Sequence, residues 1–151
     1  MADSNFVVIN EIVLKSEKDS AWIIVLKENK YSDTSLTMVV GEPEFLAIAK
    51  EKKMIQTPRP LTHELYLSIL AETRIELLQV EIHDLREKAY CARVVYQKEG
   101  IKNTADARPS DALALAINRN LPIRVDKKLL RKELTPEQAE MFRDFIKSVK
   151  F

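Results

Sequence analysis

The chain has 151 residues, about the length of one globular domain, and folding at that length buries roughly 68–70% of the unfolded chain's surface. Its formal net charge is +1, from 24 Lys and Arg against 23 Asp and Glu, which argues against a protein that binds nucleic acid through an overall basic surface. No apolar run approaches the roughly 18 residues of a membrane span, no signal peptide is visible, and the single Cys91 cannot form an internal disulfide. We therefore expect a cytoplasmic protein with no membrane partner.

The N-terminal third predicts strands followed by a helix. Residues 6–14 and 21–27 are β-branched and apolar and are separated by a polar stretch, a pattern typical of a hairpin. Residues 36–40 predict a third strand that ends at Gly41. A helix is expected to follow at once, with Pro43 in its first turn.

The middle of the chain predicts a second helix and two more strands. Two prolines within residues 57–60 require the chain to turn before a helix whose buried face is expected to contain Leu61, Leu65, Ile69 and Leu70. Apolar residues then alternate with polar ones over residues 78–83, which indicates a strand with one covered face. Residues 89–96 predict the next strand, and Glu99-Gly100 suits a tight hairpin turn. Tyr90 and Tyr96 are expected to pack in the core rather than to stack on nucleic-acid bases.

A helix near residue 109 organises the rest of the chain. Pro109 suits a first helical position, and Asp111 in the first turn interacts favourably with the positive end of the helix dipole. Residues 112–117 are all apolar, so we expect this helix to be buried on every side. Charged and hydroxyl side chains crowd its start, and a buried helix that holds such a polar cluster is typical of a functional site.

This segment also carries a family resemblance. It reads Asp106-Ala107-Arg108-Pro109-Ser110-Asp111-Ala112-Leu113-Ala114-Leu115-Ala116, and it closely resembles the signature of the bifunctional nuclease family, formerly a domain of unknown function. The resemblance extends to residues 40–44, 57–65 and 121–125 and covers roughly residues 6–132. It implies a compact α/β domain that is usually dimeric, with nuclease activity in some members.

Two domain segments follow from these patterns. Residues 1–132 are assigned to a bifunctional-nuclease-like domain, with a short last strand at residues 122–125. Residues 133–151 are assigned to a C-terminal helical extension of the same domain, because a capping-box start at Thr135 precedes an apolar stripe of Phe142, Phe145, Ile146 and Val149. That stripe must be covered, and together with the family it predicts a homodimer.

The chain also contains an apparent duplication. Three strands, a turn with proline and an alanine-containing helix occur twice, and placing residues 41–49 over residues 108–116 aligns Glu44 with Asp111. The predicted fold class is therefore α+β: two β-β-β-α half-repeats forming a curved mixed sheet, or two halves, with helices packed on it, plus a C-terminal helix. A pseudo-twofold axis between the halves would bring Glu44 near Asp106 and Asp111.

These residue types suit phosphodiester hydrolysis, which needs an activated water, neutralisation of phosphate charge and usually a metal. Glu44, Asp106 and Asp111 are candidate catalytic residues and candidate ligands of a divalent cation such as Mg²⁺, because hard cations prefer oxygen ligands. His63 is a candidate catalytic general base or acid. The candidate substrate-binding residues are Arg59, Arg108 and Ser110.

Each candidate also has a purely structural interpretation. Asp111 can serve as a first-turn anion with Ser110 as a local backbone partner, Arg108 can pair with a nearby carboxylate, and His63 can be an exposed first-turn residue. Two hypotheses therefore stand. The first is a metal-assisted nuclease that acts on RNA or DNA, and the second is a non-catalytic module that binds an anionic ligand or fixes a dimer interface.

Overall fold

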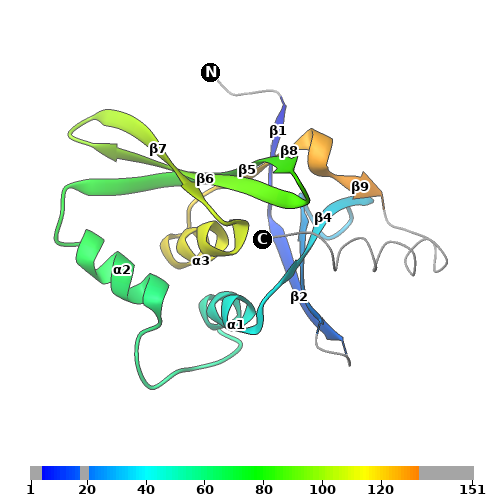
Figure 1. The fold of residues 1–151 in the computed structure, drawn as a ribbon, viewed down its shortest axis with the longest axis horizontal. Coiled ribbons are helices and arrows are strands. Elements are labelled where there is room, and N and C mark those ends of the chain that lie inside the picture. Colours follow the sequence, from blue (N-terminus) through cyan, green and yellow to red (C-terminus); the bar gives the residue numbers. More distant parts are fainter. Residues whose placement is uncertain (1–4, 18–20, 133–151) are drawn as a thin grey trace.

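The computed structural model describes residues 5–17 and 21–132 and contains two sheets with helices packed against them (Figure 1). The first sheet has the order β1-β8-β5-β6-β7 and consists of β1 (Phe6–Val8), β5 (Ile75–Arg86), β6 (Ala89–Lys98), β7 (Ile101–Ala107) and β8 (Ile123–Asp126). The second has the order β2-β3-β4-β9 and consists of β2 (Glu11–Glu17), β3 (Ala21–Lys27), β4 (Thr34–Val40) and β9 (Arg131–Lys132). The helices of the described part are α1 (Glu42–Glu51), α2 (Thr62–Leu70), α3 (Pro109–Arg119) and the short 3₁₀ helix η1 (Lys127–Leu129).

The predicted strand over residues 6–14 is divided between the two sheets. β1 pairs with β8 in the first sheet, whereas β2 forms the predicted hairpin with β3 in the second. The crossing lies at Ile9 and Asn10: the Ile9 N–H donates to the carbonyl of Ile123 at 2.8 Å, and the Asn10 N–H donates to that of Lys27 at 3.1 Å. The apolar run of residues 6–14 therefore links the two sheets, with the polar Asn10 and Glu11 at the crossing.

The α+β class and the two β-β-β-α half-repeats are confirmed. The first half runs β2-β3-β4-α1 and the second runs β5-β6-β7-α3, and the parallel pairing of β5 with β8 makes the first sheet mixed. Gly41 is the N-cap of α1 and Arg108 is the N-cap of α3. Glu44 and Asp111 are therefore both the third residue of their helices, as the alignment of the halves predicts. The predicted C-terminal helix, with its stripe at residues 142–149, lies outside the described residues.

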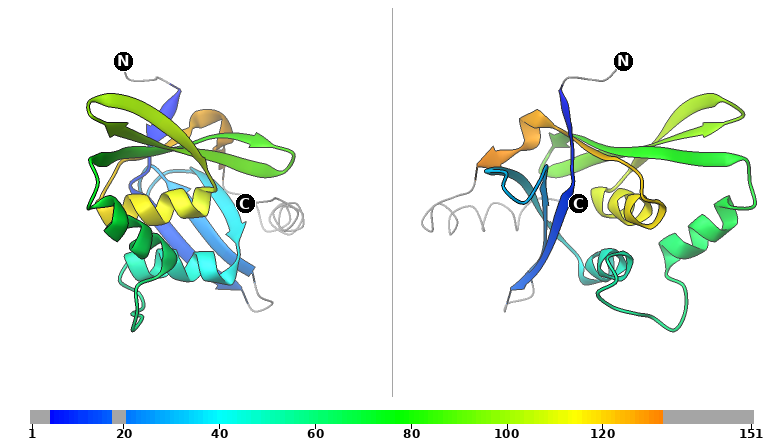
Figure 2. Two further views of the ribbon diagram at one scale, coloured as in Figure 1. Left: turned by 60° about the vertical axis from the view of Figure 1, so that its left-hand side comes forward. Right: turned by 180° about the vertical axis from the view of Figure 1, so that it is seen from behind.

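Helix α3 occupies the centre of the fold, between the first sheet and α1 (Figure 2). Its five residues from Ala112 to Ala116 are each 7% exposed or less, so the predicted burial is confirmed for them, whereas Ile117, the last residue of the predicted buried run, is only half-buried. The alanines let the neighbouring elements approach closely, and α3 contacts α1, α2, β5 and β6. α1 packs in turn on the second sheet, where Phe45 and Trp22 hold their ring centroids 4.9 Å apart.

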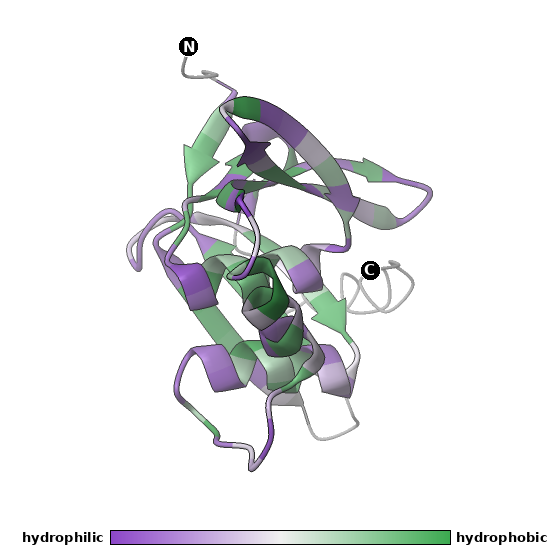
Figure 3. Ribbon diagram, turned by 90° about the vertical axis from the view of Figure 1, so that its left-hand side faces the viewer, coloured by the Kyte–Doolittle hydropathy of each residue, from purple (hydrophilic) through white to green (hydrophobic). Residues whose placement is uncertain are grey.

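Helix α2 has a different buried face from the predicted one. Leu65 and Ile69 are 56% and 60% exposed, whereas Leu67 is 2% exposed and belongs to the core. The expected buried face is therefore wrong for Leu65 and Ile69, whereas Leu61 and Leu70 are half-buried and Leu70 packs against the core. The reason is that α2 lies at the side of the molecule that faces the viewer in Figure 3 and packs against α3 along one side, so Leu65 and Ile69 remain exposed. Within the described residues, no helix has the length and apolar character needed to cross a membrane.

Candidate functional site

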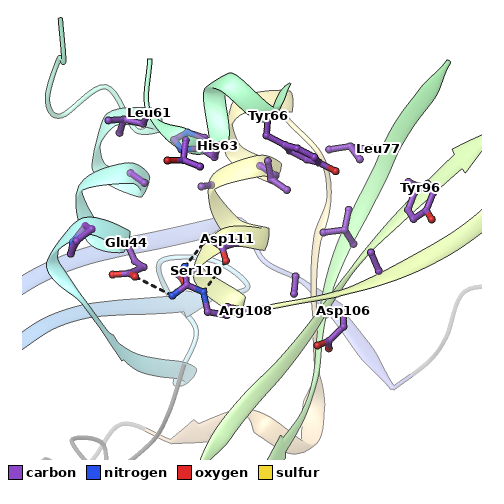
Figure 4. Close-up of a pocket in the computed structure, with 18 of the residues that line it drawn as sticks. Glu44, Leu61, His63, Tyr66, Leu77, Tyr96, Asp106, Arg108, Ser110 and Asp111 are labelled. Carbon is purple, nitrogen blue, oxygen red and sulfur yellow. Dashed lines mark hydrogen bonds and ion pairs between the residues drawn. The ribbon is translucent and has the colours of Figure 1, made fainter. Parts of the chain in front are cut away.

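A cavity of about 860 Å³ lies where the three α-helices meet the first sheet (Figure 4). Apolar and aromatic side chains form most of its wall and include Leu77, Val94 and Tyr96 of the sheet, Tyr66 of α2 and Leu115 of α3. Polar side chains line its other part: Glu44, His63, Asp106, Arg108, Ser110 and Asp111. Six of the seven candidate residues thus surround one cavity, although they come from α1, α2, α3 and the β7–α3 junction. Tyr96, expected in the core, lies on the cavity wall.

Arg108 connects the first turns of α1 and α3. Its Nε and Nη2 atoms donate to the two carboxylate oxygens of Asp111 at 2.8 and 3.1 Å, and its Nη1 atom donates to Oε1 of Glu44 at 3.0 Å. The hydrogen bonds to Asp111 first, and then to Glu44, raise the pKa of Arg108 above its ordinary range, although partial burial acts in the opposite direction. The two carboxylates therefore stabilise the charged form of the guanidinium.

Gly41 provides the space that the Glu44 carboxylate occupies. A Cβ atom on Gly41 would lie 2.4 Å from Oε2 of Glu44, which is well inside van der Waals contact. The backbone of Gly41 is extended, with φ of −73°, so a side chain at this position would meet no backbone strain but would displace the Glu44 carboxylate. The chain thus turns the Glu44 side chain back toward its own N-cap while Oε1 accepts from Arg108.

Asp106 lies on the cavity wall but apart from the other two carboxylates. It is an exposed residue of β7 opposite Arg93, and within the described part of the chain no hydrogen bond or ion pair joins it to Arg108, Glu44 or Asp111. Figure 4 shows it separated from the Glu44–Arg108–Asp111 group. The Arg108 guanidinium already lies between Glu44 and Asp111. A cation bound by all three carboxylates would therefore have to displace the guanidinium and also draw Asp106 toward the other two.

The two remaining substrate-binding candidates differ in their surroundings. The Ser110 side chain is buried at 2% exposure, and its Oγ has no hydrogen-bond partner within residues 5–17 and 21–132. Arg59 is exposed on the connection between α1 and α2 and does not line the cavity, and its backbone carbonyl accepts a 2.7 Å hydrogen bond from the Thr57 hydroxyl.

His63 is held by a residue that the sequence analysis missed. Its Nε2 lies 2.8 Å from Oε1 of Glu51, the last residue of α1, and the two side chains are only 9% and 5% exposed. The interpretation of His63 as an exposed first-turn residue therefore does not hold. A sequence signal was present, because Glu51 follows Ile48 by three positions and so lies on the same face of the helix as the buried Ile48.

A second ion pair lies beside the first. The Lys50 ammonium donates to the Glu64 carboxylate and to the Thr57 hydroxyl, and the Glu64 carboxylate also accepts from the Leu61 N–H at 2.9 Å. The backbone hydrogen bond from Leu61, followed by that from Lys50, lowers the pKa of Glu64 below its ordinary value.

The described residues contain one cluster with metal-binding geometry. Glu51, His63 and Glu64 each offer one ligand atom, and these atoms lie within 4.8 Å of one another. A mixed nitrogen and oxygen set suits Mn²⁺ or Zn²⁺ better than Mg²⁺. The Lys50 ammonium on Glu64 competes with any such cation.

The chain is similar to known proteins over most of its length. Residues 24–138 match the model of the bifunctional nuclease domain. The uncharacterized protein Rv1829 of Mycobacterium tuberculosis is 29% identical over 93% of this chain and 93% of its own length. Bifunctional nuclease 2 of Oryza sativa subsp. japonica is 28% identical over 70% of this chain and 34% of its own length. Bifunctional nuclease 2 of Arabidopsis thaliana is also 28% identical, over 70% of this chain and 33% of its own length. The chain belongs to the bifunctional nuclease domain family.

Proposed function

We propose that this protein hydrolyses phosphodiester bonds in RNA, DNA or both at the polar end of the cavity, assisted by a divalent cation such as Mg²⁺. The observation that carries the proposal is the position of Arg108, which two first-turn carboxylates hold at the wall of an 860 Å³ cavity that His63 also lines. Membership in the bifunctional nuclease domain family supports it, as do the names of the rice and Arabidopsis relatives.

The residues of the site suit distinct roles. The planar guanidinium of Arg108 can bind two phosphate oxygens at once, and Ser110 lies beside it at the start of α3. Arg59 would contact substrate outside the cavity, from the connection between α1 and α2. His63 would take the proton of the attacking water or return a proton to the leaving oxygen.

The charge of the site is the argument for a cation. Glu44, Asp106 and Asp111 place three carboxylates around the cavity, against the one guanidinium of Arg108, so a phosphodiester meets net repulsion there. A divalent cation would neutralise this charge and polarise the phosphate. We propose Glu44 and Asp111 as its ligands, with Arg108 released from one of them when substrate and cation bind. Asp106, which lies apart from both, would become the third ligand by moving toward them.

A non-catalytic module is the second candidate. Arg108 is already paired with Glu44 and Asp111, and the cavity wall is mainly apolar, so the same geometry suits an anionic ligand with an apolar body. In that case Arg108 would exchange a carboxylate of the protein for the anion of the ligand. This activity needs neither a cation nor His63.

We also propose that the protein is a cytoplasmic homodimer. The exposed apolar residues Leu65, Tyr66 and Ile69 lie together on α2, and exposed Ile101 begins β7. Burial of such side chains against a second copy would remove them from water. The single Cys91, which is free, suits a reducing compartment.

The test is a cleavage assay with purified wild-type protein and the variant Asp111→Asn. End-labelled RNA, single-stranded DNA and double-stranded DNA are incubated with Mg²⁺, Mn²⁺ or Ca²⁺, with chelator as the blank. We expect cation-dependent cleavage by the wild type and a loss of about 10²-fold or more in Asp111→Asn, because positioned charge contributes that much to such reactions. Asp33→Asn, a matched change at an exposed residue, should cleave normally. Absence of cleavage by the wild type under every condition would leave the ligand-binding module.

A further inference from the structure

The Glu51 carboxylate occupies an unfavourable place. It is 5% exposed and lies at the last residue of α1, where the negative end of the helix dipole repels a carboxylate. A buried charge of this kind destabilises a fold unless hydrogen bonds satisfy it. Its hydrogen-bond partner in the described part of the chain is Nε2 of His63, at 2.8 Å.

This contact determines which nitrogen of His63 can act in the cavity. His63 lies in the first turn of α2 and lines the cavity, whereas Glu51 does not. With Nε2 directed to Glu51, Nδ1 is the ring nitrogen left for another partner, and it has none within residues 5–17 and 21–132. An ionised carboxylate accepts but does not donate, so opposite an ionised Glu51 the Nε2 atom carries the proton.

The neighbouring ion pair fixes the same turn. Lys50 and Glu51 are the last two residues of α1. Lys50 binds Glu64 and Glu51 binds His63, so the end of α1 holds the first turn of α2 through two adjacent contacts. The Lys50 ammonium already neutralises Glu64, and the Glu64 carboxylate also caps the Leu61 N–H. The charge of Glu64 is therefore balanced without a metal ion, whereas Glu51 has only its hydrogen bond to His63, and this geometry favours orientation of the imidazole.

We propose that Glu51 is a positioning residue for His63: it holds the neutral imidazole in the Nε2–H form and leaves the Nδ1 lone pair for a proton in the cavity. The catalytic consequence rests on the proposed function. Nδ1 takes a proton from water while the water oxygen bonds to phosphorus and the ester P–O bond breaks, and the leaving oxygen then recovers that proton. Glu51 stabilises the imidazolium in between, as a buried carboxylate does beside a catalytic histidine.

The first measurement is independent of any nuclease activity. The chain has only two histidines, His63 and His83, so two-bond ¹H–¹⁵N correlation spectra identify the ring signals of His63 once His83→Gln removes the other set. With the imidazole neutral, we expect the Nε2–H form in the wild type and a mixture with the Nδ1–H form in Glu51→Met, which removes the acceptor. Glu51→Gln keeps a carbonyl oxygen and should retain part of the preference. Glu64→Gln breaks the neighbouring ion pair and should leave the form of His63 unchanged.

The outcomes separate this inference from the nuclease proposal. An Nδ1–H form in the wild type, or an unchanged form in folded Glu51→Met, overturns the inference whatever the activity. If the protein cleaves nucleic acid, Glu51→Met should lower kcat by about 10- to 100-fold with KM nearly unchanged, since a general base contributes about 10²–10⁴-fold. Glu72→Gln, a change at an exposed residue, is the control and should keep full activity. A normal kcat in Glu51→Met also overturns the inference. A wild type that keeps the Nε2–H form and cleaves nothing refutes only the nuclease proposal.

Discussion

Substitution of leucine by alanine at two positions of α2 tests how this helix is seated. Leu67 is 2% exposed and Leu65 is 56% exposed, although both lie on the same nine-residue helix. Leu67→Ala removes three buried carbon atoms, each worth about 0.8 kcal/mol by transfer from water, and leaves a cavity, so we expect a loss of about 3 kcal/mol. Leu65→Ala should change the free energy of unfolding by less than about 0.5 kcal/mol, because the side chain is largely in water.

Thermal unfolding followed by circular dichroism measures the difference. At this chain length about 1 kcal/mol corresponds to about 2–4 °C, so Leu67→Ala should lower the melting temperature by about 6–12 °C and Leu65→Ala by less than 2 °C or so. Hydrogen exchange adds a local reading, because loss of the Leu67 contact should also speed exchange of the α2 amides. Equal effects of the two substitutions, or a larger effect at Leu65, would refute the buried face described above and with it the placement of His63.

Three further predictions concern packing, charge and assembly. Ala116 is fully buried and, unlike Ala114, does not line the cavity, so Ala116→Leu should overpack α3 and destabilise the fold by about 1–3 kcal/mol in chemical denaturation. The hydrogen bond from Arg86 lowers the pKa of the Asp84 carboxyl from 3.8 to about 2, so this group stabilises the fold above about pH 4 and loses that contribution as the pH falls toward 2. NMR titration of the Asp84 carboxyl should give this lowered pKa in the wild type and a higher pKa in Arg86→Ala. Light scattering at micromolar concentration should find a dimer, and Ile69→Asp should shift it toward monomer; a wild-type monomer removes the dimer proposal.

The sequence predicted best those features that arise within one element. Three such features depend on local backbone preference and hydrophobic periodicity: the helix starts at Gly41 and Arg108 in the two half-repeats, the hairpin turn at Glu99-Gly100, and the buried body of α3. The structure contains each of them. Because Glu44 and Asp111 are the third residues of two equivalent helices, their approach through Arg108 also followed from the repeat.

Features that depend on contacts between distant elements were not predictable in the same way. Periodicity identifies the apolar residues of α2 but not which of them the rest of the chain covers, and the position of α2 beside α3 selects Leu67. Glu51 shares a helix face with buried Ile48, but it stands in the charged run that ends α1, and the sequence alone does not show that His63 covers it. Glu81 is a similar case: it is 8% exposed on an alternating strand because Arg93 of β6 donates to it at 2.6 Å.

The central claim is that the Arg108 end of the cavity performs phosphodiester hydrolysis rather than holding the fold together. Arg108 is 45% exposed at its side chain and its partner Asp111 is 52% exposed, so Arg108→Ala should cost only about 1 kcal/mol of stability. The decisive measurement compares Mg²⁺-dependent cleavage and melting temperature for wild-type protein and Arg108→Ala, prepared side by side. We expect cleavage by the wild type, a loss of about 10²-fold or more in the variant, and melting temperatures within a few degrees of each other. Equal cleavage by the two proteins, or a variant that loses activity only in proportion to its loss of folded protein, would contradict it.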